Sequence, residues 1–208
     1  MKNKIYTFLT VCITLLIGVS LHAQTTFNYT GTIETWTVPS GVTCVHIEAK
    51  GAEGGTDGSS TYPGGLGAVI SGDLTVTPGQ VLKILVGQAG TRNGGGGGTF
   101  VVDNATNSPL IIAGGGGGSG IGFDTPDKNG QAGCTGSNGT GGGGVGGTNG
   151  NGGSVSLTGF NSSAGGGLLT DGQDGSYGLN SGGKSLLNGG AGGGLGSSYG
   201  EGGFGGGG

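Results

Sequence analysis

Residues 81–118 read VLKILVGQAGTRNGGGGGTFVVDNATNSPLIIAGGGGG, and this stretch decides the fold. Its three apolar runs, at 81–86, 99–103 and 110–113, are short, rich in β-branched residues and bounded by Gly, Pro or Asn. Such runs are typical of β-strands. Between and after them stand glycine runs, which have no side chains to bury. The stretch therefore predicts strands that alternate with glycine-rich segments.

The residues before this stretch continue the strand pattern. Thr43 to Ala49 alternates between apolar and polar residues, and similar short runs at 36–38 and 67–76 end at Pro/Gly turns. Alternation is the period of a half-buried strand, and many short strands with such turns predict a sandwich or a barrel. We expect residues 24–114 to form a mostly antiparallel β-sandwich. The expected core residues are Trp36, Val45, Ile47, Ile84, Val86, Val101 and Ile111.

Glycine divides the chain into two parts. Residues 24–86 hold 11 glycines in 63 positions, whereas residues 87–208 hold 49 in 122. Glycine recurs at every third position from Gly130 to Gly142 and again from Gly141 to Gly153. Three residues per turn is the period of a left-handed polyproline-type helix, whose amides need partners on neighbouring segments. We expect residues 115–208 to form a bundle of such polyglycine helices; the alternative is a disordered glycine-rich tail.

The N-terminus has the layout of a secretory signal peptide. Lys2 and Lys4 precede an apolar run from Ile5 to Val19, and a small residue, Ala23, stands before Gln24. The run is about 15 residues long, shorter than the roughly 20 that span a bilayer. We predict cleavage between Ala23 and Gln24, which leaves one glycine-rich domain, 24–208, secreted or at the cell surface. An uncleaved anchor is the alternative.

The charge and the cysteines limit the partners further. Without the two signal lysines, five basic residues face eleven acidic ones, a net charge of −6. Such a chain has no basic patch for nucleic acid. The remaining residues contain no apolar stretch long enough to span a membrane. Cys44 and Cys134 are either one disulfide, as an oxidising compartment favours, or two thiols, and the sequence leaves both open.

Several stretches imitate catalytic or ligand-binding motifs. Gly178–Ser185 fits the Walker A pattern, but no apolar strand precedes it, so we predict that Lys184 is not a phosphate ligand. Gly196–Gly200 fits a hydrolase nucleophile elbow, but no histidine follows it. His46, Glu48 and Lys50 share one strand face, which we interpret as solvated. We expect no enzyme activity, no bound nucleotide and no cofactor.

Pairs of acidic residues resemble parts of calcium loops. Asp124 and Asp127 form one pair and Asp171 and Asp174 another, but neither has the closing Glu of an EF-hand. We interpret them as acidic turn residues and expect no metal site. A partner surface is expected instead on loops where sandwich and bundle meet, because exposed aromatic and Arg side chains carry binding energy. Its expected residues are Tyr62, Arg92, Phe123 and Tyr177.

The chain also resembles a known family. The matching segments pair strands with glycine runs in a fixed order: 36–42, 47–55, 84–90, 94–101, 109–118, 183–186 and 203–205. They resemble the glycine-rich extracellular domain of the anaplastic lymphoma kinase and leukocyte tyrosine kinase receptors, a domain also found in exported bacterial proteins. The resemblance implies a jelly-roll-like β-sandwich with an inserted or appended polyglycine-helix bundle and essentially no α-helix. The receptor version has more cysteines, a membrane span and a kinase domain, which these residues lack.

These inferences lead to one expected function and two alternatives. We expect a non-catalytic exported module, an adhesin, matrix or surface-layer component, whose partner is an extracellular protein or glycan. The first alternative is a ligand-binding ectodomain fragment of a receptor-tyrosine-kinase-like membrane protein, which fits a chain that stops inside a glycine run, truncated at its C-terminus. The second is an ice-binding protein, although the insertions at Phe160, Leu168 and Lys184 interrupt the regular face that ice binding needs.

Overall fold

The computed structural model describes residues 23–56, 62–119, 145–155, 163–175, 181–194 and 201–205. The predicted signal segment before Ala23 lies outside these ranges. Within them the chain is mainly β, with antiparallel sheets, as the sequence predicts. The one described helix is a single 3-10 turn, η2 (Leu186–Asn188). None of the described helices has the length and apolar character to cross a membrane.

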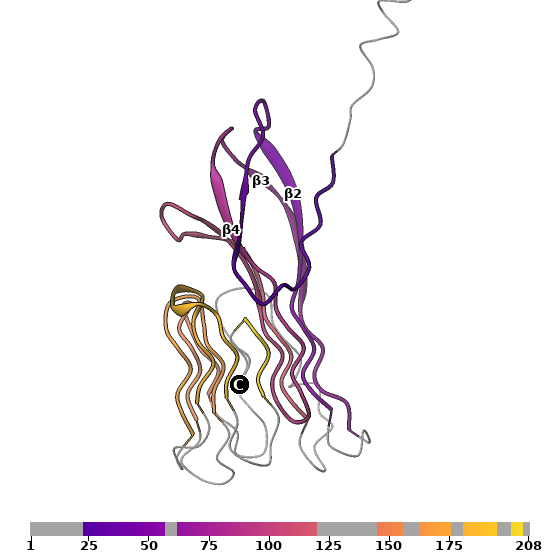
Figure 1. Cartoon of the computed structure of the whole chain (residues 1–208), viewed down its shortest axis with the longest axis vertical. Helices are drawn as coiled ribbons and strands as arrows, with labels where there is room; N and C mark the ends of the chain where they lie inside the picture. Colours follow the sequence, from indigo (N-terminus) through magenta and orange to yellow (C-terminus); the bar gives the residue numbers. More distant parts are fainter. Residues whose placement is uncertain are drawn as a thin grey trace, which may run out of the picture.

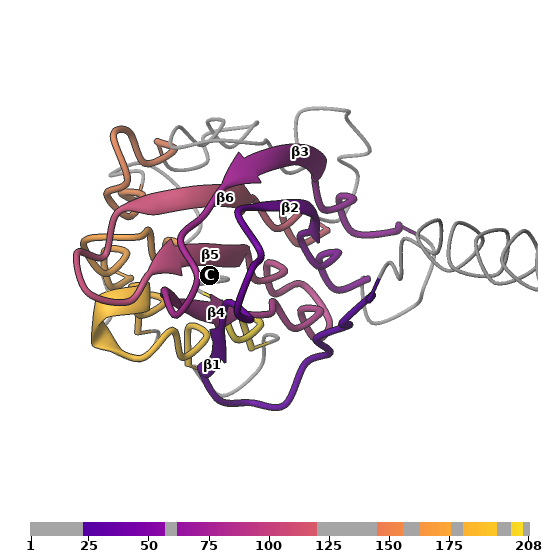
Figure 2. The same ribbon diagram turned by 90° about the horizontal axis from the view of Figure 1, so that it is seen from above.

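The strands form two antiparallel sheets (Figures 1 and 2). The four-stranded sheet has the order β1-β4-β5-β6, and β2 and β3 form a two-stranded sheet. Their bounds are β1 (Glu34–Thr37), β2 (Cys44–Lys50), β3 (Val69–Thr75), β4 (Val81–Leu85), β5 (Thr99–Asp103) and β6 (Pro109–Ala113). β2 contacts β5 and β6, and β3 contacts β6, so the smaller sheet packs at the β5–β6 side of the larger one.

A first core cluster fills the space between the two sheets. Ile84, Val101 and Ile111 are buried there. The other four expected core residues, Trp36, Val45, Ile47 and Val86, are partly buried and pack against the same cluster. The predicted alternation in β2 is confirmed, because Val45, Ile47 and Ala49 are less exposed than the residues between them. Burial of these apolar side chains is the main favourable term for this half of the fold.

The glycine-rich segments extend from one end of the sheets and run side by side (Figure 1). Backbone hydrogen bonds join them at three-residue intervals. Gly51 and Gly54 donate to the carbonyls of Ala68 and Gly65, over N–O distances of 2.8 and 2.9 Å. The amides that follow each of these, three residues apart as well, donate to a different segment: Ala52 to the carbonyl of Gly97 and Gly55 to that of Gly94. Each segment thus bonds to more than one neighbour, and the segments form a backbone lattice.

Two groups of segments build this lattice. The first consists of residues 51–56, 62–68, 86–98, 114–119 and 201–205, and therefore draws on both sides of residue 114. The second consists of 145–155, 163–175 and 181–194, where Gly172 donates to Gly183 and Gly183 donates to Ala164. Residues 201–205 join the groups, because Gly202 donates to Gly193 and Gly205 to Gly190.

A second core cluster attaches the second group to the sheet. Leu168 and Leu186 from the glycine-rich half pack with Leu85, Phe100, Val102 and Ile112 of β4, β5 and β6. In β5 the side chains alternate between clusters: Val101 belongs to the first and Phe100 and Val102 to the second. Both faces of β5 are therefore buried, which explains why its centre, Phe100 to Val102, is apolar without alternation.

Candidate functional site

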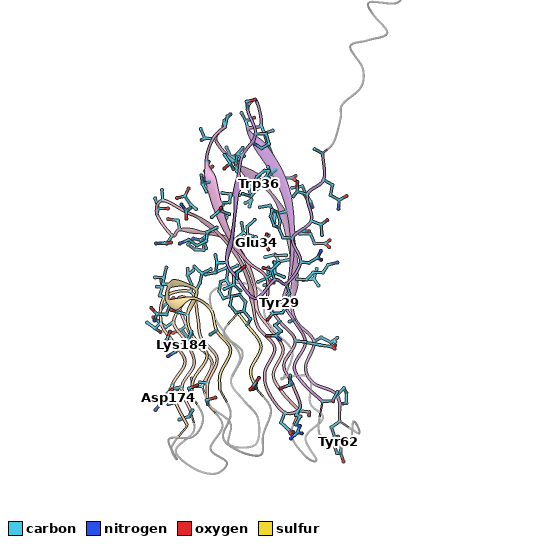
Figure 3. All side chains as sticks on the ribbon, viewed as in Figure 1. Tyr29, Glu34, Trp36, Tyr62, Asp174 and Lys184 are labelled. Carbon is cyan, nitrogen blue, oxygen red and sulfur yellow. The ribbon has the colours of Figure 1, made fainter. Side chains whose placement is uncertain are left out.

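Two of the four expected binding residues lie far from the place predicted for them. Tyr62 lies at the end of the glycine-rich segments that is remote from the sheets (Figure 3). Arg92 lies on the turn of residues 91–94, midway between the end of β4 and the start of β5. The carbonyl of Gly94 in this turn accepts a hydrogen bond from the amide of Gly55, which lies five residues beyond the end of β2. Phe123 and Tyr177 lie outside the described residues.

The turn of residues 91–94 and its neighbours form a surface that we call the distal tip. It comprises residues 53–56, 62–65, 91–94, 119 and 201. The Thr91 amide donates a hydrogen bond to the Glu201 carbonyl at 3.0 Å, and this bond holds Thr91 in place. The side-chain amide of Asn93 donates to the Ser119 carbonyl at 2.6 Å. Segments distant in the sequence therefore hold the tip in one conformation.

Arg92 is one of the exposed residues of this tip, and its backbone is unusual. Its φ angle is +47°, in the left-handed region that disfavours a residue with a Cβ. The cost is on the order of 1–2 kcal/mol. The chain has 61 glycines, which adopt this backbone conformation without the cost, yet arginine stands at this position. Strained residues of this kind cluster at functional sites.

The outer face of β2 and β3 carries His46, Glu48 and Lys50, the polar residues that the sequence analysis assigned to one strand face. His46 and Asp73 stand opposite each other in the register, with Nδ1 and Oδ1 2.7 Å apart. Lys50 Nζ lies 2.8 Å from Glu48 Oε1, and this hydrogen bond lowers the pKa of Glu48. The side chains of His46 and Asp73 are 63% and 76% exposed, so the pair is a solvated surface pair.

Cys44 is exposed at the start of the same strand and is not bonded to another cysteine of the described residues. Cys134 lies outside the described residues, so one disulfide and two thiols stay open as alternatives. Among the described residues, no group of three His, Cys, Asp or Glu side chains is placed to hold a metal ion.

The Walker-like motif is described from Ser181 to Ser185, and its donors converge on a carboxylate of the chain itself. Asp171 Oδ2 accepts from Lys184 Nζ at 2.9 Å, and Oδ1 accepts from the Ser185 amide at 2.8 Å. Asn188 Nδ2 adds a third donor at 2.9 Å. These bonds hold the pKa of Asp171 well below its usual value, with the Ser185 amide as the largest cause. The pair with Asp171 raises the pKa of Lys184.

The acidic pair Asp171 and Asp174 is likewise occupied by donors. Asp174 Oδ1 accepts from the Gly182 amide at 2.8 Å. Both carboxylates thus fasten the 181–188 segment to the 163–175 segment, which fits the interpretation as structural turn residues. The other acidic pair, Asp124 and Asp127, and the elbow-like residues 196–200 lie outside the described residues.

Sequence reasoning missed the residues that lie where sheets and lattice meet. Tyr29 is 43% exposed there, and its ring packs on Phe204 with centroids 5.9 Å apart (Figure 3). Phe204 itself packs against the second core cluster. The signal that could have found Tyr29 is weak: it is one of two aromatic residues, with Phe27, in the polar segment before the first strand. No family model matches the chain, and a search of curated proteins finds no match.

Proposed function

We propose that this chain is a non-catalytic, exported, glycine-rich module that binds an extracellular protein or glycan or builds a surface layer. The observation that carries the proposal is the backbone lattice, in which closely packed glycine segments hold an exposed tip in place. A rigid platform of this kind loses little conformational entropy when a partner binds. The preserved order of strand and glycine segments supports kinship with the receptor glycine-rich domain.

The fold that we propose is a jelly-roll-like sandwich with an attached bundle of left-handed polyglycine helices. Two observations support three residues per turn. Hydrogen-bond donors in one segment recur at intervals of three toward the same neighbour, as with Thr91 to Glu201 and Gln88 to Phe204. In Figure 2, where the segments are seen end on, they wind about their own axes. Polyproline-type helices have no internal hydrogen bonds, so the lattice bonds between segments are the ones such helices require.

A non-catalytic role is supported by how the described ionisable groups are used. His46 lies within hydrogen-bond distance of Asp73 on the surface, and Lys50 and Lys184 stand in ion pairs with Glu48 and Asp171. The buried polar side chains of the described residues are hydroxyls, those of Thr99, Ser119 and Ser185. Catalytic groups with perturbed pKa values usually occupy water-poor sites. The described ionisable groups instead have the surroundings of structural and solvated side chains.

The partner surface that we propose is the distal tip, with Arg92 and Tyr62 as its main contacts. Arg and Tyr are enriched among residues that dominate binding energy. Export would place this tip outside the cell, where a surface or a secreted partner can reach it. The acidic residues Glu53 and Glu201 are also exposed at the tip, so a partner with mixed charge fits it better than a strongly anionic one.

The test is a capture experiment with residues 24–208 immobilised on beads. Extracellular extract of the producing cells is passed over the wild type, the double variant Arg92→Ala/Tyr62→Ala and the matched control Lys50→Ala/Glu48→Ala. We expect one or a few partners on the wild type and the control, with at least a tenfold loss on the tip variant. Equal capture by all three proteins would refute the tip, and a hydrolase or transferase activity abolished by one substitution would refute the non-catalytic role.

A further inference from the structure

The described chain begins with a short exposed segment that precedes its first packed residue. Gln24, Thr25 and Thr26 are exposed, and no hydrogen bond joins them to another of the described residues. Phe27 is the first described residue that packs against a core cluster. Figure 1 shows this segment along the outside of the sheets, before the chain enters β1. Gln24 is therefore three residues away from the point at which the chain is held.

The residues that follow fasten the N-terminal segment to both cores. Phe27 packs against the first core cluster. The Tyr29 ring packs on Phe204, which itself packs against the second core cluster. These contacts fix only one end of the exposed segment, and its three residues span at most about 10 Å when extended. An α-amino group created at Gln24 would thus lie in water, beside a side chain that no described neighbour holds.

We propose that cleavage after Ala23 is followed by closure of Gln24 to pyroglutamate, a five-membered lactam. The inference rests on the proposed export, because only cleavage at this bond makes Gln24 the N-terminal residue. The α-amino nitrogen attacks Cδ of the side-chain amide and forms a new C–N bond. The bond from Cδ to Nε2 breaks, and ammonia leaves with one proton from the attacking nitrogen. The step therefore needs no oxidant, reductant or second substrate.

The surroundings of Gln24 suit this reaction. The pKa of a terminal α-amino group is about 7.7–8.0, so roughly a tenth of the molecules carry the neutral, nucleophilic amine at pH 7. Nucleophile and amide belong to one residue, which gives the amine a high effective concentration at Cδ. The Gln24 side chain is exposed, so it leaves no packed position when the ring closes. The geometry thus opposes closure neither by burial nor by a competing hydrogen bond.

The lactam changes how the N-terminus meets other enzymes. It removes the positive charge of the terminus and leaves no free α-amine. Aminopeptidases that require this amine then have no starting point on the exposed segment. Without the lactam, removal of residues 24–26 would bring such an enzyme to Phe27 and Tyr29, the residues that fasten the segment to the two cores. Closure of Gln24 therefore protects this attachment outside the cell.

Mass spectrometry of the secreted protein tests the proposal. Lys50 is the first Lys or Arg after Gln24, so trypsin releases the N-terminus as one peptide, 24–50. We expect this peptide to be lighter than its linear form by one ammonia, about 17 Da. A linear sample is prepared for comparison by freeing residues 24–208 from an N-terminal fusion with a protease immediately before digestion. It should stay mainly linear, which shows that the ring in the secreted protein did not form during handling.

Gln24→Asn is the matched control variant. Its side chain keeps the amide but is one methylene shorter, so closure would require a strained four-membered ring. The secreted variant should begin at residue 24, react fully with an amine-labelling reagent, and lose residues 24–26 to an aminopeptidase that leaves the wild type intact.

The outcomes separate the lactam from export. A linear Gln24 at the terminus of the secreted wild type overturns the lactam and leaves the proposed export in place. A terminus at any other residue overturns the lactam together with the predicted cleavage. Equal trimming of the wild type and the Gln24→Asn variant by the aminopeptidase overturns the proposed protection.

Discussion

The α-carbon of Gly54 lies against the backbone carbonyl of Gly117, and a Cβ on Gly54 would overlap that carbonyl oxygen. The two residues belong to different segments of the lattice, and their approach is as close as backbones without side chains allow. Gly51, three residues earlier, has the same relationship to Gly114. The three-residue spacing of glycine is thus the spacing at which one segment touches the next.

The first prediction concerns this contact. Gly54→Ala should destabilise the protein by about 1–3 kcal/mol, since the backbone of a neighbouring segment must move to admit a methyl group. The measurement is urea unfolding. The matched control is Gly72→Ala in β3, where a Cβ has nothing within 4 Å and φ is not in the left-handed region. This control should be neutral or gain up to about 1 kcal/mol, and equal losses in the two variants would contradict the lattice.

A second prediction tests how the glycine-rich half is attached to the sheet. Leu168 is 4% exposed in the second core cluster, and its neighbour Leu169 is 46% exposed. Leu168→Ala should cost about 2–5 kcal/mol, because it removes buried apolar contacts and leaves a cavity. Leu169→Ala should stay within about 0.5 kcal/mol of the wild type. Thermal unfolding followed by circular dichroism would measure both, and similar losses would show that the second group does not pack on the sheet.

The third prediction is a dependence on pH at Asp171. Hydrogen bonds from Ser185, Asn188 and Lys184 keep the pKa of Asp171 in the folded protein below its usual value near 3.8. A carboxyl group whose pKa is depressed on folding stabilises the native state above its unfolded pKa, and this contribution is lost as the pH falls. Amide exchange at residues 185–188 should therefore accelerate as the pH is lowered from 5 toward 2, after correction for intrinsic exchange. Asp171→Asn should show faster exchange already at pH 5 and a smaller pH dependence.

A fourth prediction separates stability from binding at Arg92. Asn adopts left-handed backbone angles more readily than Arg, so Arg92→Asn should gain up to about 1 kcal/mol in urea unfolding. The same variant should lose capture of the partner by the distal tip. A gain in stability together with full retention of binding would show that Arg92 has no part in the proposed surface.

The fifth prediction concerns export. Secreted protein analysed by mass spectrometry should begin at Gln24, because Ala23 is the small residue that precedes the expected cut. The variant Ala23→Arg should block cleavage and leave residues 1–23 attached. Uncleaved protein found only inside the cell, with Met1 retained, would refute the proposed localisation.

The strands were predictable because their signal is local. The alternation of Val45, Ile47 and Ala49 and the apolar runs in β4, β5 and β6 place these residues in strands without knowledge of their partners. All six described strands have bounds within two residues of the predicted runs, and the differences of two are at the starts of β1, at Glu34, and of β3, at Val69. The turns at Gly41 and Gly79, where φ is positive, were also readable from Pro and Gly.

The position of the candidate surfaces depended on contacts that a local pattern does not encode. Tyr62 and Arg92 were correctly assigned to loops, but whether a loop lies at the junction or at the distal tip depends on how far the glycine segments extend from the sheets. The Walker-like Lys184 was separated from phosphate chemistry by its context in the sequence, yet only the structure identified Asp171 as its partner. Tyr29 and Phe204 are 175 positions apart, and the residues adjacent to each in the sequence do not predict their contact.

The sequence by itself determined the strands, the glycine period and the expected residues of the first core cluster, because each follows from the properties of residues a few positions apart, whereas it did not indicate the second core cluster. The tertiary structure alone decided which segments bond to one another, which glycines have no room for a side chain, and which polar side chains share a surface. The physical reason is that glycine carries no side chain that could specify its neighbour. In this half of the molecule the partners are selected by backbone hydrogen bonds formed jointly across segments, as Gly51 with Ala68 and Gly54 with Gly65 illustrate.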